Sequence, residues 1–300
     1  MSKTYKSTPL VDGLFFPEGL RWANDEVLYG DIIAARCGTV GPDGKLTVRA
    51  QFASPCSGIG TLANGDMVVS LMPDRRLMRV DKGSAMSVYA DLGDMGMDHI
   101  NDIITDRQGR VYVDALNYHL HWLDPEIEPA SGETLYRFRN DATGTGDTIT
   151  DALVLVDIDG SKRVVAEDLR GPNGLAIMGD GKTMIVSEWR ANRLSRYDIA
   201  DDGSLGNREI FAELPGMPDG ICVDSEDAVW VASPTLGACI RVDLKGQILD
   251  RVEITGKRAT SCVLAGEDRR TLYITTDEMP NLGSGRIETV RVDVPGAGFP

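Results

Sequence analysis

The 300-residue chain is predicted to fold as one all-β domain, a six-bladed β-propeller with four-stranded blades around a central metal site. Three observations predict this architecture. Short apolar or alternating runs are separated by turn residues, similar segments recur about every 40 residues, and one position of the repeat is rich in oxygen ligands. Helical periodicity with proper caps is hard to find. A period near 40 with about four strands per unit is typical of a propeller blade.

Strand-forming runs recur along the chain, and each marks a blade. They combine apolar, aromatic and β-branched residues, and a turn rich in Asn, Asp or Gly precedes most of them. Residues 5–16 should supply the outer part of the last blade, or pack beside it, because such closure protects the edges of the sheets. We expect the marking strands at residues 26–30, 66–70, 110–113, 183–186, 228–231 and 272–275.

Six short segments can be aligned as the starts of the repeats. Their spacings are about 40 to 46 residues, except for about 72 residues between the third and the fourth. A polar, Gly- and Thr-rich stretch accounts for the long spacing, and we interpret it as an insertion in blade three at about residues 118–150, not as a linker between domains. The segments are residues 17–20, 57–60, 100–103, 172–175, 218–221 and 260–263.

The second residue of each segment should point toward the common axis of the propeller. An Asn-Gly or Asp-Gly pair alone would be an ordinary turn, but a shared repeat position favours a common site. The glycine of the second segment provides no ligand, and we interpret this gap as a point of substrate entry. The six residues are Glu18, Gly58, Asn101, Asn173, Asp219 and Ser261.

Four of these residues suit one divalent metal ion. Glu18 and Asp219 supply two negative charges, and Asn101 and Asn173 supply carbonyl oxygens. The four include no cysteine or histidine, which favours Ca²⁺ over Zn²⁺. We therefore expect Ca²⁺, with Mg²⁺, Mn²⁺, Fe²⁺ and Zn²⁺ as alternatives.

Composition narrows the classes of partner. The formal net charge of -15 argues against nucleic acid and against an anionic membrane surface, because both are bound through clusters of Lys and Arg. The chain has five cysteines without C-x-x-C spacing, and we expect them to be reduced thiols. The N-terminus has no apolar signal region, and no apolar run approaches about 20 residues. We expect a soluble, cytoplasmic protein that acts on a small molecule, and the sequence leaves its oligomeric state open.

Several stretches carry a resemblance to a known family. They are residues 17–22, 101–102 with 106–112, 171–176, 192–198, 218–220 with 224, and 260–262. In this order and spacing they resemble the gluconolactonase/regucalcin (senescence-marker protein) family of six-bladed propeller lactonases. The resemblance implies that Glu18, Asn173 and Asp219 match divalent-metal ligands, and that Asn101 matches an asparagine that meets metal or substrate.

One residue departs from the family pattern. In the sugar-lactone members, an arginine two residues before the matching asparagine holds the hydroxyl groups of the substrate, whereas this chain has His99. The departure favours a less hydroxylated or aromatic substrate. His99 is expected to share one side of an extended segment with Asn101, where it would contact the substrate or transfer a proton.

Four further residues are candidates for substrate binding. His119 and His121 alternate on a predicted strand and so share a face, and together with Tyr118 they could line one wall of the pocket. The alternative for the two histidines is an exposed loop. Trp189 follows a strand of blade four, where it either packs between blades or forms part of the pocket wall.

The resemblance and the site together predict a metal-dependent hydrolase that opens a lactone. The metal would act as Lewis acid, and Asp219 would act as base or hold the attacking water. Two alternatives keep the metal: phosphotriester hydrolysis, or a non-hydrolytic ring reaction or isomerisation. A third is a non-enzymatic calcium-binding propeller. Chelation should separate these classes, because only an enzyme would lose turnover with EDTA.

Overall fold

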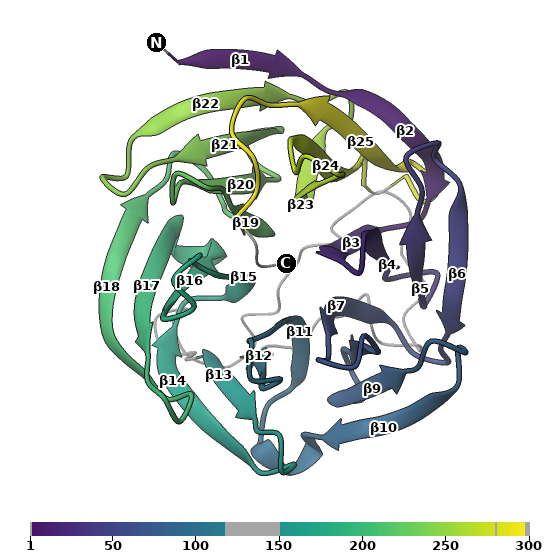
Figure 1. Ribbon diagram of the computed structural model, residues 1–300, viewed down its shortest axis with the longest axis vertical. Coiled ribbons are helices and arrows are strands. Elements are labelled where there is room, and N and C mark those ends of the chain that lie inside the picture. The colour runs from purple at the N-terminus through teal and green to yellow at the C-terminus, as the bar shows by residue number, and fades with distance from the viewer. Residues whose placement is uncertain (1, 118–150, 280, 298–300) are drawn as a thin grey trace.

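The structure is a computed structural model that describes residues 2–117, 151–279 and 281–297. Six sheets surround one central axis, with the innermost strands around the centre (Figure 1). Only short 3-10 turns accompany the strands within the described residues. The predicted all-β, six-bladed propeller is confirmed.

Each of the first three blades runs from the axis outward in the order of the chain. The strands of these blades are β3 (Pro17–Ala23), β4 (Glu26–Asp31), β5 (Arg36–Val40) and β6 (Leu46–Gln51); β7 (Cys56–Thr61), β8 (Met67–Leu71), β9 (Arg76–Val80) and β10 (Met86–Asp91); and β11 (His99–Thr105), β12 (Val111–Leu116), β13 (Asp151–Val156) and β14 (Lys162–Leu169).

The last three blades repeat this order, and the N-terminal strands complete two of them. The strands are β15 (Pro172–Ile177), β16 (Thr183–Glu188), β17 (Arg193–Ile199) and β18 (Leu205–Glu213); β19 (Ile221–Val223), β20 (Val229–Ser233), β21 (Ala238–Val242) and β22 (Ile248–Glu253), with β1 (Lys3–Lys6) outside them; and β23 (Arg258–Ala265), β24 (Thr271–Asp277) and β25 (Gly285–Arg291), with β2 (Thr8–Leu14) outside them.

The N-terminus closes the ring as the sequence predicts. Strand β2 pairs antiparallel with β25, so it is the outermost strand of blade six. Strand β1 was not anticipated: it pairs parallel with β22 and makes blade five five-stranded. The contact that favours this position is between Tyr5 and Trp230, whose rings meet edge-on with centroids 6.5 Å apart.

The apolar core lies between the blades. One cluster of buried side chains fills each of the six interfaces between neighbouring sheets, including the interface between blades six and one. Many strands are therefore buried on both faces, for example Val68 and Val69, which are adjacent on β8 and both 0% exposed. All five cysteines are buried and free, as expected.

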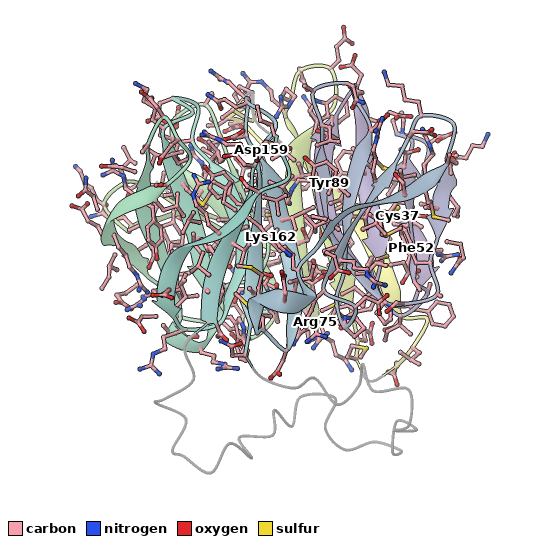
Figure 2. All side chains as sticks on the ribbon, turned by 90° about the horizontal axis from the view of Figure 1, so that it is seen from below. Cys37, Phe52, Arg75, Tyr89, Asp159 and Lys162 are labelled. Atoms are coloured by element: carbon pink, nitrogen blue, oxygen red, sulfur yellow. The ribbon has the colours of Figure 1, made fainter. Side chains whose placement is uncertain are left out.

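The propeller has two faces, which Figure 2 shows from the side. The innermost strands begin at one of them, here called the ring face, where Arg75 lies in the turn between β8 and β9. Asp159, in the turn between β13 and β14, lies toward the opposite side, here called the far face.

Blade three contains the long spacing seen in the sequence. Strands β12 and β13 pair directly with each other, and residues 118–150 connect them along the chain. The predicted insertion itself lies outside the described residues. No helix in the described ranges is long and apolar enough to cross a membrane.

Candidate active site

The six aligned segments meet at the ring face of the propeller. Their second residues are called the central ring below: Glu18, Gly58, Asn101, Asn173, Asp219 and Ser261. Neighbouring segments touch through their backbones, and the Oγ of Ser261 accepts a hydrogen bond from Leu20 N at 3.2 Å, which links the last segment to the first. The structure therefore brings the segments into one ring around the axis.

Glycines next to the candidate ligands allow this close approach. A Cβ atom added to Gly19 would lie 2.4 Å from the carbonyl oxygen of Ser57, and one added to Gly174 would lie 2.4 Å from that of Asp219. Gly58 is equally constrained, because its Cβ would lie 2.5 Å from Ile103 N. The backbone of β11 therefore fills the space beside Gly58, and the prediction that substrate enters at this position stays a prediction.

A β-bulge lies at the aligned segment of most innermost strands. Five of the six innermost strands shift register at the aligned segment, for example between Glu18 and Arg21 and between Ile100 and Ile103. A bulge bends its strand and re-aims side chains, and bulges are common beside active sites. In blade five the bulge is replaced by an opening of the strand, since β19 begins only at Ile221.

The second strand of each of three blades supports the bulge of the first. Asp114 accepts a hydrogen bond from Asn101 N at 2.7 Å. In the same way Gly58 N donates to Ser70 Oγ at 2.9 Å, and Ser261 N donates to Thr275 Oγ1 at 2.8 Å. These bonds satisfy backbone N–H groups that the bulge takes out of the ladder, and so they fix the shape of the ring.

Glu18 and Asp219 are the two acids of the central ring, and burial perturbs both. Burial raises the pKa of Glu18, and repulsion from Asp102 adds to the effect. Burial likewise raises the pKa of Asp219 well above its usual value, with the charge of Glu18 as the next cause. Neither carboxyl group forms an ion pair with a residue of the described ranges.

The two asparagines differ in how firmly they are held. Asn101 is 9% exposed, and its Oδ1 accepts a hydrogen bond from Ser57 Oγ at 2.7 Å. Since a carbonyl oxygen has two lone pairs, Oδ1 keeps one for a ligand. The half-buried Asn173 forms no side-chain hydrogen bond within the part of the chain that the structure describes.

These donors fit a divalent cation. The half-buried side chains of Asn173 and Asp219 form no hydrogen bond with the described residues, so their oxygens are open to a ligand. Two acids that repel each other, with carbonyl oxygens on the same ring, are what a hard divalent ion would stabilise. The ring holds only two acidic residues, and no group of three or more His, Cys, Asp and Glu residues in the described ranges could hold a metal.

A buried ion pair connects the strands of two members of the ring across blade two. Arg21 Nη2 on β3 donates to both carboxylate oxygens of Asp102 on β11, at 2.9 and 3.1 Å, and to the carbonyl oxygen of Ile103 at 2.7 Å. Arg21 Nη1 also donates to Leu20 O at 2.9 Å. The pair neutralises Asp102 and ties the bulge that carries Glu18 to the bulge that carries Asn101.

An apolar cluster lies at the ring face beside these residues. Its buried members are Phe16, Ile32, Met72 and Leu116, each at or next to a strand end, and Trp189 packs against them. The Trp189 ring lies against the backbone of Gly171, since an added Cβ there would be 2.4 Å from the indole Nε1. Trp189 therefore belongs to the apolar side of the ring face.

The remaining predicted residues are placed as follows. His99 is 3% exposed and is the first residue of β11, paired with Leu116 at the ring face. Tyr118, His119 and His121 lie outside the described residues, so their predicted place in a pocket wall stays a prediction.

Sequence reasoning missed the supporting residues of the ring. Ser70 and Asp114 lie on the second strands, facing the bulges, and a search for polar residues in a strand otherwise apolar would have found them. The ion pair of Arg21 and Asp102 joins residues 81 positions apart, so no local sequence pattern predicts it. Both residues do lie inside the aligned segments or next to them.

A comparison with known families identifies the chain. A family model described as the SMP-30/Gluconolactonase/LRE-like region matches residues 16–278. The chain belongs to this family. The match includes all six members of the central ring, and it confirms the resemblance seen in the sequence.

Individual relatives show the same affiliation. The 6-deoxy-6-sulfogluconolactonase of Pseudomonas putida is 33% identical over 160 residues, which are 49% of this chain and 55% of that protein. Pentonolactonase XacC of Haloferax volcanii is 26% identical over 94% of this chain and 92% of that protein. The solved structure of regucalcin, a calcium-binding protein from Agrobacterium tumefaciens str. C58, has a TM-score of 0.78 at 19% identity, covering 100% of this chain and 99% of that one.

Proposed function

We propose that this protein is a metal-dependent lactonase, whose central ring holds one divalent cation, most favourably Ca²⁺. Family relatives that are named lactonases support lactone hydrolysis as the broad activity. The observation that carries the metal dependence is the pair of acids Glu18 and Asp219, which are close enough for the charge of Glu18 to raise the pKa of Asp219, while neither forms an ion pair in the described ranges. Asn101 and Asn173 complete the ligand set.

Each residue of the ring has a role in this proposal. The bound ion would supply Lewis-acid activation of the ester carbonyl and stabilise negative charge on its oxygen. Asp219 accepts a proton from the attacking water or holds that water in position. The water oxygen bonds to the carbonyl carbon, the ring C–O bond breaks, and the leaving oxygen takes up a proton. The product is a hydroxy acid.

Ring-face residues suggest which lactones fit. His99 stands where the sugar-lactone enzymes of the family have an arginine, and the neighbouring cluster of Phe16, Ile32, Met72 and Leu116 is apolar. These four side chains are buried, so the apolar surface open to a substrate is that of the half-buried Trp189, which packs against them and favours burial of hydrocarbon over binding of several hydroxyl groups. We propose that aliphatic or aromatic lactones are better substrates than sugar lactones, with His99 in contact with the substrate.

The test is a pH-indicator hydrolysis screen of sugar, aliphatic and aromatic lactones. EDTA-stripped protein is assayed alone and with Ca²⁺, Mg²⁺, Mn²⁺, Zn²⁺ or Fe²⁺. We expect acid release only with added metal, and loss of nearly all turnover in Asp219→Asn. The matched control is Asp227→Asn, because Asp227 is an exposed turn residue of the same blade with a positive φ of 58°, which asparagine tolerates.

The outcomes separate the alternatives. If no lactone is hydrolysed while metal still raises the melting temperature, phosphotriester hydrolysis or a non-hydrolytic ring reaction that uses the same ion would be favoured. Metal binding without turnover of any substrate class would favour a calcium-binding propeller without enzymatic activity. Near-normal activity of Asp219→Asn would contradict the role given to Asp219. A cytoplasmic location remains part of the proposal.

A further inference from the structure

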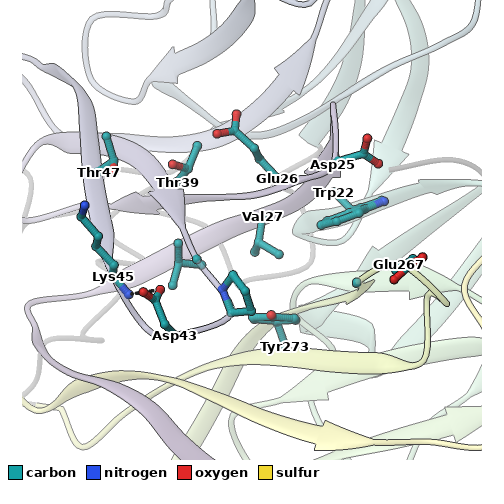
Figure 3. Close-up of a pocket in the computed structure, with 14 residues that line it drawn as sticks. Trp22, Asp25, Glu26, Val27, Thr39, Asp43, Lys45, Thr47, Glu267 and Tyr273 are labelled. Carbon is teal, nitrogen blue, oxygen red and sulfur yellow. Dashed lines mark hydrogen bonds between the residues drawn. The ribbon is translucent and has the colours of Figure 1, made fainter.

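A second concave site lies on the far face, between blades one and six (Figure 3). It is a pocket of about 680 Å³, formed by the end of β3, the turns that follow β3, β5 and β23, and residues of β4, β5, β6 and β24. Trp22 on its wall is four residues after Glu18 on β3, which places the two Cα atoms roughly 13 Å apart along the strand. The pocket is therefore separate from the central ring.

The floor of the pocket is apolar and aromatic. Val27, Val40 and Tyr273 belong to the core cluster between blades six and one, and Trp22 packs against that cluster from the pocket side. Trp22 is half-buried, so part of its indole ring faces the open space. A ligand that enters here meets a hydrophobic surface with one large aromatic face.

Two polar groups in this floor lack partners. Tyr273 is only 5% exposed, and its hydroxyl forms no hydrogen bond with any residue the structure describes. The indole N–H of Trp22 likewise has no acceptor in the described ranges. Neither atom is one of the fully buried polar atoms that lack a partner in the described ranges, so both reach the open space of the pocket and can bond to a ligand or to water.

The rim of the pocket is strongly acidic. Four exposed carboxylates surround the opening, contributed by Asp25, Glu26, Asp43 and Glu267, and Lys45 is the single basic residue in the lining. Glu26 has one distant cationic neighbour, Arg49, at 4.0 Å. Neither Asp25 nor Glu267 forms an ion pair within the described ranges. The lining therefore carries a net negative charge of three, from four acids and one base.

We propose that this far-face pocket binds a small organic cation with an apolar or aromatic body, such as an arylalkylammonium ion. The body would lie on Val27, Val40 and the Trp22 ring, and the ammonium group would lie among the rim carboxylates. A cation beside an indole face is attracted by the ring as well as by the acids. The Tyr273 hydroxyl, which both donates and accepts, can serve a polar substituent on the ligand.

A sugar ring is the competing occupant, because carbohydrates also stack on tryptophan. It would use the carboxylates only as hydrogen-bond acceptors, so its binding would not depend on net charge. The net charge of minus three attracts a cation from any direction. It gives no comparable attraction for a neutral ligand. The charge of the lining therefore favours the cation.

The experiment is isothermal titration calorimetry of the full-length protein with phenethylammonium chloride, 2-phenylethanol and methyl glucoside. We expect one-site binding of the ammonium ion and at least roughly tenfold weaker binding of the neutral alcohol of the same shape. Protein labelled with fluorotryptophan locates the site: the ¹⁹F signal that is missing in Trp22→Phe should be the one that moves on titration.

Matched variants separate a specific site from general attraction to an acidic protein. Asp25→Asn with Glu267→Gln should weaken ammonium binding about tenfold or more. The control, Glu167→Gln with Glu213→Gln, makes the same charge change at exposed positions of blades three and four and should alter affinity less than about twofold. Equal loss in both pairs, equal binding of the alcohol, tighter binding of the glucoside, or no binding at millimolar concentration would overturn the proposal.

Discussion

Replacing Arg21 by methionine tests whether the buried ion pair holds the central ring together. Methionine keeps much of the side-chain volume but removes the hydrogen bonds to Asp102, Ile103 and Leu20. The side chains of Arg21 and Asp102 are 3% and 8% exposed, so solvent cannot replace the lost cation. Removing one partner of a buried ion pair typically costs about 3 to 5 kcal/mol.

This cost can be translated into a melting temperature. With an unfolding entropy of about 2.1 cal/mol/K per residue, a chain of 300 residues loses roughly 5 to 8 °C for such a change. The assays are urea unfolding and thermal melting in EDTA, so that no ion contributes. The double variant Arg21→Met with Asp102→Asn should recover part of the loss, because it leaves no buried charge unpaired.

Metal binding supplies the second readout of this prediction. Arg21 is not a ligand, yet it ties the bulge of Glu18 to that of Asn101, so Arg21→Met should weaken the affinity for the ion about tenfold or more. Lys45→Met is the matched control, since it removes an exposed cation from the far face. A loss in unfolding free energy below about 1 kcal/mol in Arg21→Met, or a metal affinity equal to that of the control, would refute the reasoning.

Three further predictions concern the ring. Ser57→Ala removes the hydrogen bond to Asn101 Oδ1 and should weaken metal affinity about tenfold by calorimetry, while the unfolding free energy in EDTA changes by only about 1 kcal/mol. In EDTA the unfolding free energy should fall as pH rises from about 4.5 toward 8, because Glu18, whose pKa is raised to about 8, holds its proton longer in the folded state. Over the same range the gain in melting temperature from added Ca²⁺ should grow, and Glu18→Gln should reduce this trend without abolishing it, because burial also raises the pKa of Asp219. Among substrates, an aromatic lactone should give a higher kcat/KM than gluconolactone, and the reverse order would contradict the part assigned to the apolar cluster.

Much of the fold follows from the repeat. Each blade needs four short strands and tight turns, and these leave a local signature that recurs at a fixed spacing. The outer position of β2 could be predicted because an open ring would leave a sheet edge exposed. Strand β1 could not, since Lys3–Lys6 is short and polar, and its place depends on the distant contact between Tyr5 and Trp230.

The candidate ligands were accessible to sequence reasoning for the same reason. Equivalent positions of a closed repeat must meet at the axis, so Glu18, Asn173 and Asp219 could be grouped without knowledge of any contact. What the repeat does not encode is how the ring is supported. Asp114 acts from the next strand, and Arg21 reaches across a blade to Asp102, so only the tertiary structure brings these pairs together.

The central claim is that one divalent ion is held by the ring, and anomalous diffraction from crystals grown with Mn²⁺ or Ca²⁺ tests it most directly. We predict a single strong anomalous peak at the axis on the ring face, with oxygens of Glu18, Asn101, Asn173 and Asp219 about 2.1 to 2.6 Å away. Asp219→Asn crystals should show a weaker peak or none. The proposed metal site would be contradicted if the only peaks lay elsewhere and the four side chains were hydrogen-bonded to water alone.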